Sequence, residues 1–265
     1  MRSTLRAFFE RLFRAATCLG FTLPGIGVAL AQDKPAPEEF PMRIQGDVGA
    51  GAYYTGSIVR GKSESGYVLP YGYFDYGRAF MRIDTLGIKT VKMGYGHLEL
   101  VGRVSFDGFK ADTASLRGLS DRKDPVPLGI GTFQETPVGA FFVNAFRDAN
   151  KSKGNIFEAM YVGEIRMPRV TIYPQAGAEY LSRRYTGYFY GISAPESAAS
   201  GYRAYQPGGA FNPFIAALVD TTLSEDVHLN FYLRHKWLAG SVTDSPIVGR
   251  NGMDTVFVSL AYRFK

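Results

Sequence analysis

Three histidines and a few serines are the side chains in this sequence that could perform metal or hydrolytic chemistry. The histidines are His97, His228 and His235, and the last two are seven residues apart. On an extended strand an odd spacing points two side chains to opposite faces, so these two cannot bind one metal ion together. No His-x-His pair or carboxylate cluster completes a metal site. The spacing favours structural histidines, and we expect no metal or other cofactor.

A serine hydrolase would need a serine, a histidine and an acid or amide that converge in space. Ser193, Ser197 and Ser245 lie in segments expected to be loops, Asp244 precedes Ser245, and His235 could approach them. Asp-Ser and Ser-Pro pairs are also ordinary turn sequences, so they do not identify a catalytic serine. A hydrolase is the least supported function, and we expect a protein that is not an enzyme.

The N-terminal segment 1–31 has the pattern of a helical secretory signal peptide. It carries four arginines, then 17 mostly apolar residues interrupted by Pro24, and it ends in Ala29-Leu30-Ala31, a cleavage sequence before Gln32. The alternative is a membrane anchor, which the short length and the proline disfavour. Cys18 is the only cysteine and lies in this segment. The mature chain therefore has no disulfide, zinc-thiolate site or thiol nucleophile.

Removal of the signal peptide lowers the formal net charge from +6 to +3, because four arginines and one glutamate leave with it. The remaining chain has no basic cluster interleaved with aromatic residues, so we expect no nucleic-acid partner. Residues 32–41 are polar and proline-rich and are interpreted as a short periplasmic leader. Residues 42–265 form the third predicted part of the chain.

Apolar and polar residues alternate through much of 42–265, most clearly at 227–237. Alternation with period two is typical of a strand that has one apolar face. We predict twelve strands, at 44–56, 66–76, 78–84, 87–92, 97–109, 127–134, 137–147, 154–166, 168–182, 211–223, 226–238 and 253–265. If the third and fourth form one bent strand, ten is the better count.

The connectors between these strands alternate between short turns and long loops, which is typical of an up-and-down barrel in a membrane. Only the connector near 85–87 breaks this rule, because it is short where a long loop is due. No segment of the mature chain has 18 consecutive apolar residues, so helical spans are not expected. We therefore predict an all-β fold, a transmembrane antiparallel up-and-down β-barrel with 12 strands.

The polar faces of these strands carry many charges, which a barrel in lipid would place in its lumen. The candidate lumen-facing residues are Glu99, Arg103, Glu158, Glu164, Arg234 and Lys236. A soluble barrel would instead bury its aliphatic face and expose these charges, and alternation alone does not separate the two. The signal peptide, the loop asymmetry and the aromatic last strand favour the membrane.

The segment 189–205, FYGISAPESAASGYRAY, resembles the MltA-interacting protein family, MipA/OmpV. The segment 242–248, VTDSPIV, is a second similarity. Weaker ones are Tyr54-Thr55-Gly56-Ser57, followed by Tyr67-Val68-Leu69-Pro70, and the closing Tyr262-Arg263-Phe264. Residues 110–150 match no motif of the family. The resemblance implies a protein of the Gram-negative outer membrane, in contact with its lipid and without known catalysis.

The same resemblance implies candidate partners. One family member is described as a scaffold that joins a murein-degrading transglycosylase to a murein synthase, and others as porin-like or adhesive. A fold resemblance does not transfer a partner surface, so murein enzymes are an expectation only. Three functions remain in competition: a scaffold in the cell envelope, a narrow channel for small solutes, and a barrel hydrolase.

The two family-like segments lie in the loops 187–207 and 242–248, on the same side of the predicted barrel. One interpretation is an exposed binding surface, because aromatic and arginine residues dominate such surfaces. The favoured one is a lid folded into the barrel mouth, in which the two loops pack together. The candidate lid residues are Tyr190, Gly191, Ser193, Ser197, Ser200, Gly201, Tyr205, Asp244, Ser245 and Pro246.

Overall fold

The computed structural model describes residues 40, 42–62 and 65–265, which belong to one compact unit that starts at Glu39. The predicted signal peptide lies outside the described residues, as does most of the predicted leader. The strands are β1 (Gln45–Thr55), β2 (Ser65–Tyr76), β3 (Ala79–Arg82), β4 (Thr85–Met93), β5 (Gly96–Arg103), β6 (Pro127–Thr136), β7 (Gly139–Asp148), β8 (Asn155–Val162), β9 (Ile165–Arg166), β10 (Val170–Leu181), β11 (Ala210–Thr222), β12 (Val227–Trp237) and β13 (Gly252–Phe264).

These strands form one closed antiparallel sheet. Successive strands pair with each other from β1 to β8 and from β10 to β13, β13 pairs with β1, and β10 pairs with both β8 and β11, which leaves no open side to the sheet. β8 and β9 pair with β10 in one continuous register, Val162 with Gln175 and Ile165 with Ile172, so they occupy a single position in the wall. The described residues thus form the predicted barrel of twelve strands, and the ten-strand alternative is wrong.

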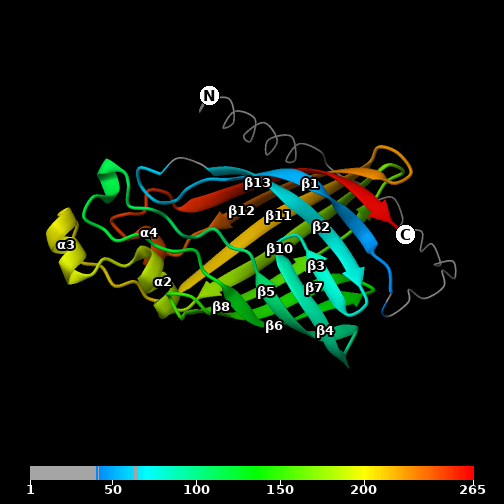
Figure 1. Cartoon of the computed structure of the whole chain (residues 1–265), viewed down its shortest axis with the longest axis horizontal. Helices are drawn as coiled ribbons and strands as arrows, with labels where there is room; N and C mark the ends of the chain where they lie inside the picture. The colour runs from blue at the N-terminus through cyan, green and yellow to red at the C-terminus, as the bar shows by residue number, and fades with distance from the viewer. Residues whose placement is uncertain (1–39, 41, 63–64) are drawn as a thin grey trace, which may run out of the picture. The chain divides into compact units, whose positions relative to one another are not determined.

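The connectors define two ends of the barrel. At one end, which we call the turn end, β1 begins and β13 finishes, with Gly46 opposite Phe264. The turns there are short, and Gly77 and Gly94 adopt positive φ angles of 56° and 59° that most residues avoid. The long connectors lie at the opposite loop end, where the helices α2 (Arg183–Tyr190), α3 (Ala194–Ser200) and α4 (Gly240–Thr243) gather (Figure 1). None of the described helices has the length and apolarity of a membrane span.

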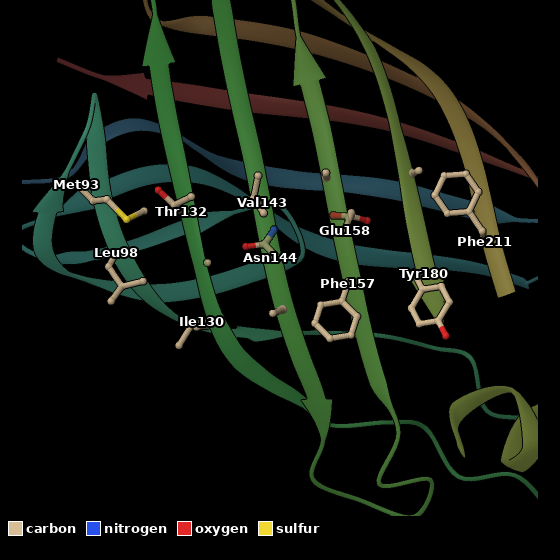
Figure 2. Close-up of a pocket in the computed structure, with 14 residues that line it drawn as sticks. Met93, Leu98, Ile130, Thr132, Val143, Asn144, Phe157, Glu158, Tyr180 and Phe211 are labelled. Atoms are coloured by element: carbon tan, nitrogen blue, oxygen red, sulfur yellow. The ribbon is translucent and has the colours of Figure 1, made fainter. Parts of the chain in front are cut away.

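The two faces of the wall differ as a barrel in lipid requires. On β12, Phe231 faces outward and is 44% exposed, whereas the neighbouring Asn230 faces inward and is 1% exposed. On the outer face, Phe157, Tyr180 and Phe211 lie side by side on β8, β10 and β11 (Figure 2). A soluble barrel would bury such side chains, so the soluble alternative is wrong. An apolar outside and a charged inside are the pattern of a membrane barrel.

One predicted strand ends early. The strand expected at 97–109 stops at Arg103, and residues 104–108 continue without a strand partner among the described residues. The reason is the neighbouring hairpin: β3 has four residues, and β4 begins after the two-residue turn Ile83-Asp84. Between β2 and β5 the wall therefore extends less far towards the loop end than it does in the rest of the barrel.

Candidate functional site

A cavity of about 1890 Å³ occupies the inside of the barrel. All six predicted lumen residues line it: Glu99, Arg103, Glu158, Glu164, Arg234 and Lys236. Most of them are paired with an opposite charge, as ionised side chains in a largely enclosed space must be. The arrangement of these pairs determines how much of the lumen is free.

The central feature is an ion bridge that crosses the lumen, formed by Arg103, Glu158 and Arg234. Arg103 Nη2 lies 2.6 Å from Glu158 Oε1, and Arg234 Nη2 lies 3.7 Å from Glu158 Oε2. The arginines come from β5 and β12, which are six wall positions apart, and so the bridge joins opposite sides of the barrel. Their side chains are 12%, 7% and 20% exposed in the order named, so the pairing is only weakly screened by water.

Further ion pairs flank this bridge. Lys236 Nζ lies 3.0 Å from Glu179 Oε1, and Arg82 Nη1 lies 3.1 Å from Glu99 Oε1. Glu179 and Arg82 were not among the predicted lumen-facing residues. Alternation on β10 places Glu179 on the polar face, so a signal existed for it, whereas β3 is too short to show a period around Arg82.

Glu164 behaves differently from the other predicted lumen residues. It pairs with Arg166 at 2.8 Å, and the Arg166 side chain is 75% exposed. An exposed pair of this kind contributes at most about 1 kcal/mol. Glu164 therefore lines the rim of the turn end rather than the interior.

A second ion network closes the barrel seam near the turn end. Arg263 on β13 donates to Asp47 on β1 at 2.6 and 2.7 Å and to Asp220 on β11 at 2.8 Å. His228 Nδ1 lies 2.7 Å from Asp220 Oδ1, and both side chains are buried. The network links the first strand to the last and explains His228 as a structural residue.

A small apolar core, which we call the loop core, lies among the connectors at the loop end. It draws on connectors far apart in the chain, and a bridge between Val59 and Val248 joins two of them. At its centre Phe189 is 0% exposed, with the Tyr185 ring at 4.7 Å and the Tyr188 ring at 4.9 Å. Its other buried members include Ile58, Leu116, Tyr190, Ile192, Val242 and Ile247.

Hydrogen bonds connect the two family-like segments within this core. The buried Ser245 Oγ donates to the Tyr190 carbonyl at 2.6 Å. The Tyr205 hydroxyl donates at 2.9 Å to the carbonyl of Ser241, one residue before the second segment, and at the surface Arg203 donates to the Asp244 carbonyl at 3.0 Å. The structure therefore brings the segments 187–207 and 242–248 together.

The remaining predicted lid residues shape these segments locally. Ser193 and Glu196 form a capping box at the start of α3, and Gly201 ends α3 with a φ of 77°. The other contacts are Ser197 Oγ to the Tyr202 carbonyl, the Tyr202 N–H to Ser200 Oγ, Arg60 Nε to the Pro246 carbonyl, and the close approach of Gly191 to the Gly187 carbonyl.

The residues considered for catalysis are placed apart. Ser245 is buried against Tyr190, whereas His235 Nδ1 lies 2.6 Å from Asp254 Oδ1 on side chains that are 38% and 57% exposed. Asp244 offers its carbonyl to Arg203. Among the described residues, no three histidine, cysteine or acidic side chains are grouped for metal binding.

Comparison with known proteins identifies the family of this chain. Residues 48–264 match the family described as "MltA-interacting protein MipA". This chain belongs to the MipA family. YiaT of Escherichia coli strain K12, named as an outer membrane protein, is 26% identical over 82% of this chain and 90% of its own. The MltA-interacting protein of the same strain is 26% identical over 56% of this chain and 60% of its own.

Family membership also gives the location. Omp26La, an outer membrane protein of Vibrio anguillarum, is 26% identical over 68% of this chain and 67% of its own. The crystal structure of the outer membrane channel DcaP of Acinetobacter baumannii aligns over 84% of this chain and 96% of that one, at 10% identity and a TM-score of 0.29. The relatives and the barrel place this protein in the outer membrane of a Gram-negative bacterium, where short turns face the periplasm.

Glu196 holds the 114–122 loop onto α3, and this contact should depend on pH. Burial alone would raise the pKa of Glu196, but hydrogen bonds from the Ser193 and Ser120 backbones, and from Ser193 and Arg122 side chains, lower it to about 2. The carboxylate thus stabilises the docked loop fully above its ordinary pKa of 4.5, and this stabilisation is lost as pH falls from there towards 2.

We expect pepsin cleavage within 114–122 to increase as pH falls through this window. Glu196→Gln should be cleaved at pH 4.5 as fast as at lower pH, after correction for pepsin activity on an unfolded substrate. Identical pH profiles for the native protein and the variant would show that this carboxylate does not hold the loop.

A second hollow of about 390 Å³ lies on the wall formed by β4 to β8, β10 and β11 (Figure 2). Its floor contains the small residues Gly131, Ala145, Ala159 and Ala178, and larger apolar side chains surround it. Because Ile130, Phe157 and Phe211 around it are about half exposed, it belongs to the outer apolar face rather than to the lumen.

Proposed function

We propose that this protein is a non-catalytic structural barrel of the cell envelope, and that segments 187–207 and 242–248 act as a lid at the cell surface. The packed loop core is the observation that supports this function. A barrel whose surface end is closed by buried side chains, and whose lumen is crossed by an ion bridge, is better suited to structure than to free diffusion. Its apolar outer face would contact outer-membrane lipid.

We infer that a scaffold role uses the turn end, because murein enzymes work in the periplasm. A relative bears the name MltA-interacting protein, which supports murein enzymes as the candidate partners. The turn end carries exposed apolar side chains, with Val138 72%, Tyr95 68% and Leu223 52% exposed. The turns are short, so the partner surface would be small. In the same proposal, 1–31 is the cleaved signal peptide and 32–41 the leader.

Site-specific cross-linking in intact cells tests the scaffold. A photoreactive amino acid at Val138 should capture a murein hydrolase or synthase, and the same group at Arg184, exposed at the loop end, should not. Equal capture at both positions, or capture of no murein enzyme at 138, 95 and 223, would contradict the proposal.

A narrow channel for small solutes is the second candidate, because the lumen is large and its wall is charged. If it conducts, Arg103 and Arg234 stand in the ion path. Replacing either with glutamine should then shift selectivity towards cations, measured as the reversal potential across a planar bilayer. A folded protein that carries no current would remove this candidate.

A further inference from the structure

The barrel wall has a lateral gap between β2 and the segment 104–108, on the loop-end side of the β3–β4 hairpin. β2 pairs with β1 along nearly its full length but with β3 only at Tyr73–Tyr76. The ladder on either side of the hairpin ends with Ile83 N–H to the Gly72 carbonyl and Val104 N–H to the Asp84 carbonyl, both 2.8 Å. Among the described residues, Gly66–Tyr71 have no strand on this side.

The sequence of β2 suits a strand that has no neighbouring strand on the gap side. Gly72 bonds towards β3, so alternation directs the backbone groups of Pro70 and Val68 into the gap. Proline has no N–H to leave unpaired, which is why it is found at sheet edges. Unpaired backbone in contact with hydrocarbon is costly, so the gap must be filled by a side chain, water or a ligand.

The base of the gap is strained. Ile83 has a φ of 58°, a conformation that is rare for a β-branched residue. Glycine would relieve the strain in this two-residue turn, yet isoleucine occupies the position. Such strain persists where surrounding structure imposes it, and it is concentrated at sites of function.

Two aromatic rings bridge the gap. Tyr67 from β2 stacks on Phe106 with ring centroids 5.1 Å apart and an interplanar angle of 18°. Both side chains are about 40% exposed, and both line the lumen cavity. The cavity therefore reaches the wall at this pair, which closes it by ring contact rather than by a hydrogen-bonded ladder.

The two sides of the gap differ in chemistry. Outside it are the apolar side chains Val68 and Leu86, which are 83% and 49% exposed, and Val104 at its edge is 51% exposed and also lines the cavity. Inside it, Asp84 and Asp107 line the cavity. An apolar approach from the membrane that leads to carboxylates fits a molecule with a hydrocarbon tail and a positive head.

The groups around these two carboxylates leave them able to bind a cation. Asp107 accepts hydrogen bonds from the Ser105 and Tyr185 hydroxyls, both at 2.6 Å. Asp84 accepts a hydrogen bond from the Thr85 hydroxyl at 2.9 Å and has Arg103 Nε at 3.8 Å, but both terminal nitrogens of Arg103 already bind Glu158. The negative charge inside the gap is thus only partly neutralised, and the nearby tyrosine and phenylalanine rings would also attract a cation.

We propose that the Tyr67–Phe106 pair is a lateral gate through which a cationic amphiphile enters the lumen from the membrane. The tail passes between the rings, and the ammonium head binds Asp107 and Asp84 above the ion bridge. This site does not depend on the murein-enzyme proposal, since it uses the wall and not the turn end.

The test uses the full mature chain in phosphatidylcholine nanodiscs and a photoreactive dodecylammonium probe. The probe should label the protein saturably near Phe106 and Tyr53, which both line the cavity. Dodecylamine should compete, while dodecanol and dodecanoate, which have the same tail, should not. Asp107→Asn should raise the half-saturating concentration about tenfold or more, as the loss of one charged partner does. Asp107→Glu should restore it; if Asp107→Asn does not fold, Asp84→Asn replaces it.

A second experiment holds the gate shut with a cross-link. Tyr67→Cys with Phe106→Cys, joined by a short thiol-specific linker, should abolish labelling. Phe141→Cys with Tyr161→Cys is the matched control, because these rings are 5.2 Å apart on β7 and β8, where the wall is continuous. Unchanged labelling of the linked gate, or equal competition by dodecanoate, would overturn the proposal.

Discussion

Phe189→Ala should open the loop end of the barrel and turn a closed protein into a conducting one. The ring is 0% exposed and packs against three tyrosines of α2. Truncation of a buried phenylalanine costs about 3–5 kcal/mol, because the apolar contacts are lost and a cavity remains. The loop core is small and joins connectors rather than strands, so it should loosen while the hydrogen-bonded wall persists.

Planar-bilayer recording and limited proteolysis measure this effect. The variant should show current steps and faster cleavage in 182–209, while the native protein shows neither. Phe211→Ala is the matched control, since that ring is 61% exposed on the outer face and should leave the closure intact. A variant as silent and as resistant as the native protein would mean that the loop core does not close the barrel.

Glu158→Gln should produce the largest loss of stability in the lumen wall. The change removes the anion that Arg103 and Arg234 share and leaves two poorly solvated guanidinium groups facing each other. Breaking a buried pair by removing one partner costs about 3–5 kcal/mol. The midpoint of urea unfolding, followed by the gel shift between folded and unfolded barrel, measures the change.

Glu164→Gln provides the control for this prediction. Its partner Arg166 is exposed at the turn end, so the substitution should cost at most about 1 kcal/mol. Equal shifts of the unfolding midpoint for the two variants would show that water in the lumen screens the ion bridge as effectively as at the surface.

The wall could be predicted from sequence because alternation is a local property. Residues 227–237 show which side chains face inward, and the positions of Arg234 and Lys236 follow from that pattern. Their partners could not be predicted in the same way. Glu158 lies three wall positions from β12, and contacts across a lumen depend on the tilt and stagger of the closed barrel.

At the loop end, too, some contacts could be predicted from the sequence and others could not. The family-like segments predicted that 187–207 and 242–248 pack together, and the Ser245 contact to Tyr190 matches that packing. Leu116 in the loop core was not expected, because 110–150 carries no motif. The short connector near 85–87 indicated an irregularity in the wall beside β2. The stacking of Tyr67 on Phe106 could not be predicted from the sequence, because it depends on the folded positions of two distant segments.

Cysteine labelling in intact cells tests most directly whether the loop end is the closed, outward-facing end of the barrel. Cys18 is the only cysteine and lies in the predicted signal peptide, so single cysteines can be read without background. A maleimide on a polymer too large for porins should label Arg184→Cys in intact cells and Glu164→Cys only after the outer membrane is permeabilised. Labelling of Glu164→Cys in intact cells at the rate of Arg184→Cys would contradict this account.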